Sequence, residues 1–143
     1  MGRIALISCA KQKCNLPRTK AKNMYASPLF KKSLEYVKNK LKPNKTFILS
    51  AKYGLLELEQ EIDIYDETLK DKSKKEKREW AEKVFDQIKL KCNIEIDEFI
   101  FLAGKIYYKN LINLLPNREK VKILMENYKI GKRLHFLKGE LNE

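Results

Sequence analysis

Cys9 is the residue of this sequence with the widest range of possible chemistry. It follows the apolar run at residues 4–7 and is followed by Lys11 and Lys13. A nearby ammonium group favours the thiolate, which is the nucleophilic form of cysteine. We therefore predict Cys9 and Lys11 as catalytic residues, with Lys11 also placed to bind an anionic oxygen. The alternative is a buried thiol that only fills space at the end of a strand.

Carboxylates around Tyr65 supply the acid–base candidate. Asp63, Asp66 and Glu67 flank this tyrosine in a segment without clear periodicity. A carboxylate there could act as a general base or stabilise a cationic, sugar-like transition state. We predict Asp66 as the third catalytic residue. The alternative is a solvated loop carboxylate or a helix cap.

Other chemistries lack their usual residue patterns. A zinc site would need Cys9, Cys14, Cys92 and His135 together, and this weak spacing predicts no metal. The P-loop, dinucleotide-binding and H-E-x-x-H patterns are missing, so no cofactor is predicted. No apolar run approaches the roughly 18 residues of a membrane span. An odd cysteine count without an export signal favours free thiols and a cytoplasmic location.

Apolar runs and helical spacing predict the elements that must position these residues. Buried strands are expected at residues 4–7, 46–49, 99–102 and 121–124. Helices are expected at residues 28–41, 73–92, 107–115 and 128–141. Ser27 before Pro28 is typical of a helix start, and Ser73 with Glu76 has the spacing of a capping box. Residues 10–24 and 51–69 are expected to be loops, and the second loop is long enough to suggest a function.

The alternation of strands and helices predicts one α/β domain over residues 1–143. Its sheet is expected to be mostly parallel and four-stranded, with helices on both faces. Ligands of such sheets bind beyond the carboxyl ends of the strands. Tyrosines there could stack on a base. The predicted ligand-binding residues in these turns and in the second loop are Lys13, Ser50, Tyr53, Gly54, Tyr65, Gly104 and Tyr107. We expect Lys11 and Tyr53 to share one pocket, because they follow strands expected to be neighbours.

The charge of the chain favours a polyanionic partner. The net charge is +12, and residues 1–56 contain thirteen Lys and Arg residues but a single acidic residue, Glu35. Such a basic segment is typical of proteins that bind DNA, RNA or nucleotide phosphates, and we expect DNA rather than RNA. The alternative is a lysine-rich proteome in which the charge serves only solubility.

Six segments together resemble a family of small domains of unknown function from bacteria, archaea and phages (DUF6884-like). They are I-S-C-A-K-Q-K from Ile7, Y-A-S-P-L-F from Tyr25, L-S-A-K-Y-G-L-L from Leu49, I-D-I-Y-D-E-T-L from Ile62, L-A-G from Leu102 with Tyr107, and I-G-K-R-L from Ile130. The family usually has Ser where this chain has Ala10. The resemblance adds Tyr25, Ser27 and Arg133 to the expected ligand-binding residues.

Two characterised groups resemble parts of the same pattern. Residues 49–69 are similar to a segment of the YaaA peroxide-stress proteins, which bind DNA, although Ile64 replaces the proline before Tyr65. The segment after Cys9 is more loosely similar to the core domain of archaeosine synthases, which act on a deazaguanine base in transfer RNA. These resemblances imply an enzyme directed at a nucleobase or nucleic acid, such as a base-modifying, glycosylase-like or transglycosylase-like enzyme. The alternatives are a non-catalytic DNA-binding protein of stress defence and a binder of small phosphates or nucleotides.

Overall fold

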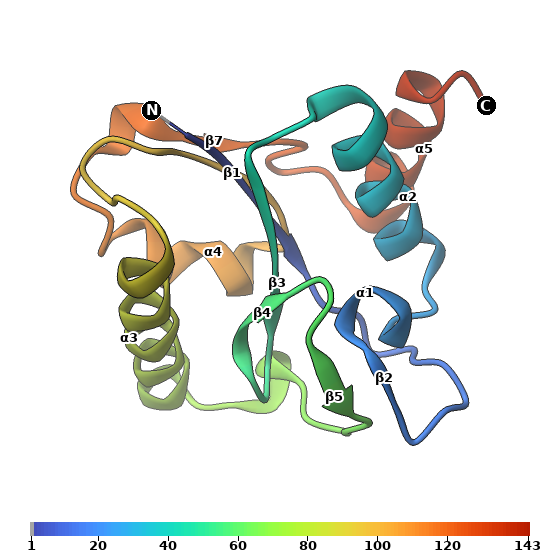
Figure 1. Cartoon of the computed structure of the whole chain (residues 1–143), viewed down its shortest axis with the longest axis horizontal. Helices are drawn as coiled ribbons and strands as arrows, with labels where there is room; N and C mark the ends of the chain where they lie inside the picture. The colour runs from blue at the N-terminus through green and yellow to red at the C-terminus, as the bar shows by residue number, and fades with distance from the viewer. Residues whose placement is uncertain (1) are drawn as a thin grey trace.

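A five-stranded sheet in the order β4-β3-β1-β6-β7 forms the centre of the protein (Figure 1). The computed structural model describes residues 2–143. The parallel strands are β1 (Arg3–Ser8), β3 (Lys45–Ser50), β6 (Glu98–Leu102) and β7 (Val121–Ile123). Strand β4 (Gly54–Glu57) runs antiparallel to β3. The α/β prediction is confirmed, but the sheet is mixed and five-stranded instead of four-stranded.

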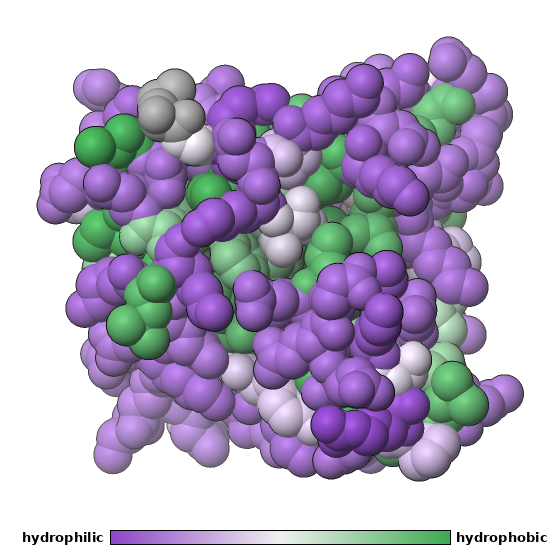
Figure 2. All heavy atoms as spheres, viewed as in Figure 1, coloured by the Kyte–Doolittle hydropathy of each residue, from purple (hydrophilic) through white to green (hydrophobic). Residues whose placement is uncertain are grey.

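Helices cover both faces of this sheet (Figure 1). One face carries α3 (Lys74–Lys91) and α4 (Lys105–Ile112). The other carries α1 (Ala21–Met24), α2 (Pro28–Tyr36) and α5 (Ile130–Glu140). None of the helices within residues 2–143 is long and apolar enough to cross a membrane. Figure 2 shows mainly hydrophilic residues on the face it presents.

Alternation along β1 divides the core into two layers. Ile4 and Leu6 are buried with the side chains of α3 and α4, whereas Ala5 and Ile7 are buried on the α1 and α2 side. Successive side chains of a strand point to opposite faces, so a strand covered on both faces reads as one apolar run. Strand β1 pairs with β3 and with β6, which puts the carboxyl ends of these strands at one edge.

The two helix starts predicted from capping residues are confirmed, whereas the helices expected from residues 107 and 128 begin at Lys105 and Ile130. The Ser27 side chain accepts a hydrogen bond from the Phe30 amide at 3.1 Å, and Ser73 and Glu76 form a capping box. The helix expected at residues 28–41 changes character instead of continuing as one α-helix. Its last turn, Val37–Leu41, is a π-helix that ends at Lys42, a residue with φ of 48°. A left-handed residue of this kind commonly stops a helix.

The two segments expected to be loops contain short strands. Strand β2 (Arg18–Lys20) pairs antiparallel with β5 (Glu61–Asp63), and α1 follows β2 directly. Strand β4 turns back on β3 through Gly54, whose φ is 77°. These strands are only three or four residues long, so they carry too little alternation to be recognised in the sequence. Short 3-10 helices complete the chain at Leu69–Asp71 and Arg118–Lys120.

Candidate functional site

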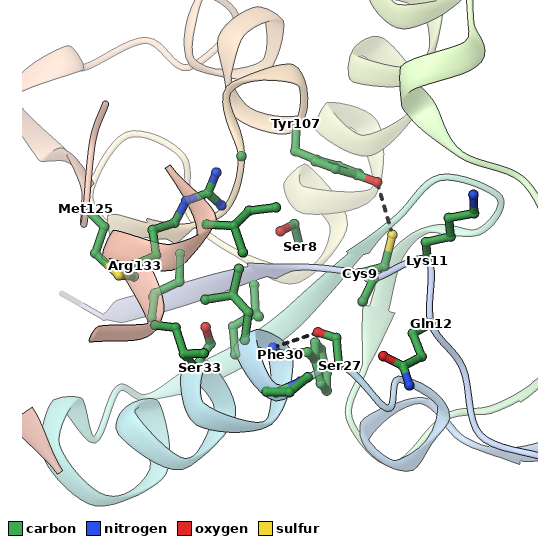
Figure 3. Close-up of a pocket in the computed structure, with 18 of the residues that line it drawn as sticks. Ser8, Cys9, Lys11, Gln12, Ser27, Phe30, Ser33, Tyr107, Met125 and Arg133 are labelled. Atoms are coloured by element: carbon green, nitrogen blue, oxygen red, sulfur yellow. Dashed lines mark hydrogen bonds between the residues drawn. The ribbon is translucent and has the colours of Figure 1, made fainter. Parts of the chain in front are cut away.

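A cavity of about 710 Å³ opens at the carboxyl ends of β1 and β6 (Figure 3). The turn after β1, the first turns of α2 and α4, and the inner side of α5 line it. Apolar side chains form most of the wall, among them Phe30, Leu102, Ile106 and Leu134. A volume of this size is typical of sites for small ligands. The cavity lies where open α/β sheets usually bind their ligands.

The charged groups of the cavity are all cationic. Lys11, Lys105 and Arg133 belong to its lining, and none of the lining residues found within residues 2–143 is an Asp or Glu. Lys11 follows β1, Lys105 begins α4 and Arg133 lies on α5. Their positive charge and the apolar wall together suit a ligand with a flat apolar part and an anionic group.

Cys9 and Tyr107 form the polar pair at one end of the cavity. The Cys9 Sγ and Tyr107 Oη atoms are 3.3 Å apart in a hydrogen bond, and both residues line the cavity (Figure 3). The Tyr107 ring packs against Trp80 at a centroid distance of 5.7 Å, which holds the hydroxyl toward the sulfur. Burial, followed by charge on the neighbouring Cys9, raises the pKa of Tyr107 above its ordinary value. The hydroxyl therefore keeps its proton at neutral pH and can donate it in a hydrogen bond to sulfur.

A second hydroxyl network lies behind the cavity. The Tyr25 and Tyr65 hydroxyl oxygens are 2.6 Å apart, and Ser50 donates to the Tyr65 oxygen at 2.8 Å. Burial raises the pKa of both tyrosines, and a negative charge on Cys9 raises it further. Both phenols stay neutral. This network satisfies its own buried oxygens, and Ser50 Oγ also accepts from the Tyr53 amide at 3.1 Å, which stabilises the turn after β3.

The structure brings part of the predicted site together and leaves part of it outside. The predicted residues that line the cavity are Cys9, Lys11, Ser27, Gly104, Tyr107 and Arg133. The remaining ones lie outside its lining: Lys13, Tyr25, Ser50, Tyr53, Gly54, Tyr65 and Asp66. Tyr25, Ser50 and Tyr65 are buried, whereas Asp66 is exposed to solvent. Lys13 packs its Nζ 4.5 Å from the centre of the Tyr65 ring.

Tyr53 does not share the cavity with Lys11. Its hydroxyl lies 3.2 Å from both the backbone oxygen and the backbone nitrogen of Asp63, so it fixes β5 against the β3–β4 turn. Gly54 also lies outside the cavity lining, and its role is to form the turn between β3 and β4. Neighbouring strands do bring residues to a common edge, but the chain after β3 turns away toward β4 and carries Tyr53 with it.

Several residues that line the cavity were not predicted from the sequence as site residues. Ser8 is the last residue of β1, Gln12 lies in the turn after it, and Met125 lies in the turn after β7. Ser33 and Ile130 come from helices α2 and α5, which pack against each other and both contribute to the lining. The strand-end position is the signal that could have indicated the first three. Nothing in the spacing of Ser33 or Ile130 distinguishes them from ordinary helix residues.

The cysteines and acidic residues of the described chain form no metal centre. Cys9, Cys14 and Cys92 are all free thiols, and no group of three or more His, Cys, Asp or Glu residues within residues 2–143 could hold a metal ion. Cys92 follows α3, where burial raises the pKa of its thiol. Of the three thiols, Cys9 is the one that lines the cavity.

Residues 4–139 match a family of unknown function (DUF6884). The match covers nearly the whole chain, so the chain belongs to this family. Searches of the curated proteins and of the solved structures found no match. The comparisons thus support the family resemblance of the motifs and add nothing on YaaA proteins or archaeosine synthases.

Proposed function

We propose that this member of the DUF6884 family binds a nucleobase-bearing ligand in the cavity and cleaves or exchanges its base–sugar bond at Cys9. One observation carries the proposal. A free thiol, paired with the Tyr107 hydroxyl, lines an apolar-walled cavity whose charged groups are cationic. The similarity of the Cys9 segment to archaeosine synthases, which act on a base in transfer RNA, agrees with this class of ligand.

The wall of the cavity suits the flat face of a base. Phe30 and Ile106 lie in the first turns of α2 and α4, on two sides of the cavity. A base between apolar and aromatic side chains gains from stacking and from loss of water contact. The polar groups of Ser8 and Gln12 lie in the same lining and offer hydrogen bonds to a base edge.

The proposed reaction uses sulfur as nucleophile and Lys11 as proton donor. The Cys9 thiolate attacks C1′ of the sugar, an S–C1′ bond forms, and the C1′–N bond breaks with its electron pair going to the base. The Lys11 ammonium protonates the departing nitrogen. Water or a second base then attacks C1′ and gives a proton to the Lys11 amine, and the thiolate leaves. Asp66, being exposed and outside the cavity, receives no role in this scheme.

The test is product analysis with the intact protein. The purified chain is incubated with a panel of nucleosides, modified bases and nucleotides, and mass spectrometry follows free base and any adduct on the protein. Cys9→Ala should abolish base release, whereas Cys92→Ala removes another free thiol outside the cavity and should retain it. Base release by Cys9→Ala at the wild-type rate would exclude the sulfur mechanism.

Polyanion binding is the second candidate function, because the net charge is +12. The fold offsets part of the basic charge of residues 1–56. Arg18 forms an ion pair with Asp63 at 2.9 Å, and Lys20 and Lys22 pair with Glu59 at 2.9 Å and 2.6 Å. This pairing leaves less free charge for a nucleic acid than the sequence indicates. It favours the cavity as the main site.

A further inference from the structure

Arg133 occupies the end of the cavity opposite Cys9 and Tyr107 in Figure 3. Its Nε donates a hydrogen bond to the Tyr128 carbonyl at 3.0 Å, which fixes the guanidinium through a single contact. The two Nη atoms approach the turn before α4, since a Cβ built on Gly104 would lie 3.9 Å from each of them. The outer edge of the guanidinium is thus aimed at the beginning of α4 from within the cavity wall.

Within the described part of the chain, the Arg133 guanidinium lacks a carboxylate partner. Across residues 2–143 no carboxylate forms an ion pair with Arg133, and the cavity lining holds no Asp or Glu. Burial lowers the pKa of Arg133, a sign that its positive charge is partly removed from water. A partly desolvated cation without an anion is unfavourable, so a bound anion at this position would relieve the cost.

Two further kinds of donor belong to the start of α4, which lies beside Arg133. Gly104 precedes α4 and has no side chain to cap the first amides of the helix. The Tyr107 amide donates to the Gly104 carbonyl at 2.9 Å, which leaves the Lys105 and Ile106 amides at the positive end of the helix dipole for a ligand. Lys105, the first residue of α4, also lines the cavity. Arginine, helix amides and a lysine are the donors that phosphate groups commonly use in proteins.

We propose that Arg133, Lys105 and the Gly104 turn form a phosphate subsite, so that the ligand is a mononucleotide whose phosphate binds at Arg133 and whose sugar and base extend toward Cys9. This inference rests on the proposed function for the base end of the ligand. The cavity volume of about 710 Å³ suits a ligand of mononucleotide size. A fork of two Nη donors fits two phosphate oxygens at once, which a single ammonium group cannot do.

Calorimetric titration of a nucleoside, its 5′-monophosphate and inorganic phosphate tests the subsite. We expect the monophosphate to bind at least about tenfold more tightly than the nucleoside, as loss of a charge-assisted contact implies. Arg133→Gln should remove this advantage, so that the monophosphate binds no more tightly than the nucleoside to this variant. Arg133→Lys keeps the positive charge but not the two Nη donors, so it should lose an intermediate part of the monophosphate affinity. This variant also controls for failure of Arg133→Gln to fold.

Lys132→Gln is the matched control. It removes the same charge from the neighbouring residue, whose Nζ lies over the Tyr128 ring and outside the cavity lining. Monophosphate affinity should stay within about twofold of wild type in this variant. An equal loss of monophosphate affinity in Lys132→Gln and Arg133→Gln would mean that only the net charge of the protein matters, which would overturn the subsite.

The outcomes separate the subsite from the proposed function. Equal affinities for nucleoside and monophosphate overturn the phosphate subsite while nucleobase binding stands. Arg133-dependent binding of inorganic phosphate, with no gain from any nucleoside portion, supports the subsite and overturns the nucleobase function. Arg133-dependent binding of an oligonucleotide but not of the mononucleotide assigns the phosphate to a nucleic-acid chain and overturns the mononucleotide assignment.

Discussion

Cys9 reaches the cavity with a sulfur atom whose hydrogen-bond partner comes from a distant part of the chain. The Tyr107 hydroxyl lies 98 residues away in sequence and 3.3 Å away in space. Sequence reasoning singled out both residues, because each follows a strand of the predicted sheet, yet it did not predict that they touch. Their contact depends on the entry of α4 and on the packing of the Tyr107 ring on Trp80, which only the folded chain defines.

Removal of one hydroxyl should therefore change the reactivity of Cys9. In Tyr107→Phe the sulfur loses a donor that stabilises its thiolate, so we expect alkylation of Cys9 by iodoacetamide to slow. A loss of about 1 kcal/mol corresponds to roughly a fivefold lower rate at neutral pH. Peptide mass spectrometry of the alkylated protein measures the rate at this thiol alone.

Tyr108→Phe provides the comparison for this variant. Tyr108 is buried on the α3 and α4 side of the sheet, next in sequence to Tyr107 but outside the cavity lining. Its hydroxyl can be removed without a change at Cys9, so the alkylation rate should match wild type. Equal rates in both variants would mean that the Tyr107 contact has no influence on the thiol.

The element that departs most from sequence-based expectation is the hairpin of β3 and β4. Gln87 on α3 holds its turn: the Gln87 Oε1 atom accepts from the Leu55 amide at 2.9 Å, and its Nε2 donates to the Tyr53 carbonyl at 3.3 Å. Gly54 has φ of 77°, and a Cβ there would lie 2.3 Å from Gln87 Oε1. Both the backbone conformation and the close approach exclude a side chain.

Gly54→Ala should destabilise the protein by about 1–3 kcal/mol, because the new methyl group forces strain at positive φ and displaces Gln87. Gly139→Ala is the control: its Cβ meets nothing within 4 Å, and it lies inside α5, where alanine is favoured by up to about 1 kcal/mol. Urea unfolding followed by circular dichroism compares the two. If the Gly54→Ala protein is as stable as wild type, the turn does not require glycine at this position.

A pH effect is expected where β2 and α1 meet the β4–β5 connection. Hydrogen bonds from Lys22 and then Lys20 lower the pKa of Glu59 from 4.5 to about 2. A carboxylate with a lowered folded-state pKa contributes stability above its unfolded value and loses that contribution as pH falls through the folded value. Wild type should thus be more stable than Glu59→Gln at pH 6, and this difference should disappear as the pH falls from about 4.5 to about 2.

Salt gives an independent check on the Glu59 effect. The pair is exposed, so its contribution is small and should weaken further at about 1 M salt, where screening acts over roughly 3 Å. A difference between wild type and Glu59→Gln that grows as the solution is acidified would contradict the assignment.

At the scale of elements, the sequence was most informative where an apolar run or a cap was long enough to be distinct. Ser73 with Glu76 located the start of α3, and the runs at residues 4–7 and 99–102 located β1 and β6. Strands β2 and β5 pair with each other although more than forty residues of sequence separate them, as the pairing of Thr19 with Ile62 shows. Such a pair depends on a long-range contact, so local spacing could not predict it.

For the whole molecule, the uneven charge along the sequence differs from the distribution of charge in the fold. Carboxylates of Glu59 and Asp63 lie beside Lys20, Lys22 and Arg18, so a basic sequence segment becomes a mixed surface. The strand order, in contrast, agreed with the expectation that β1 and β3 are neighbours. That adjacency is why the edge of the sheet was a correct place to look for a cavity. Of the lining from α5, the family resemblance indicated Arg133, whereas nothing in the sequence marked Ile130 or Leu134 as site residues.

Binding of a DNA oligonucleotide should fall with salt because the net charge is +12. Log affinity should decrease linearly with log salt concentration between roughly 50 and 200 mM, with a slope set by the number of phosphates contacted. Fluorescence anisotropy of a labelled duplex gives the slope, and an uncharged peptide nucleic acid of the same sequence serves as control. Affinity that stays constant over this range would exclude electrostatic DNA binding.

Trp80 gives the protein a built-in optical reporter. It is the one tryptophan of the chain, its side chain is 6% exposed, and its indole nitrogen donates to the Ser50 carbonyl at 2.9 Å. Its ring lies edge-on to Tyr107, whose hydroxyl meets the Cys9 sulfur. Emission from a single buried indole is sensitive to charge and quenching groups within a few ångströms, so alkylation of Cys9 or entry of a ligand should change the fluorescence without any added dye. Trp80, a core residue, should therefore also report whether Cys9 is modified or the cavity is occupied.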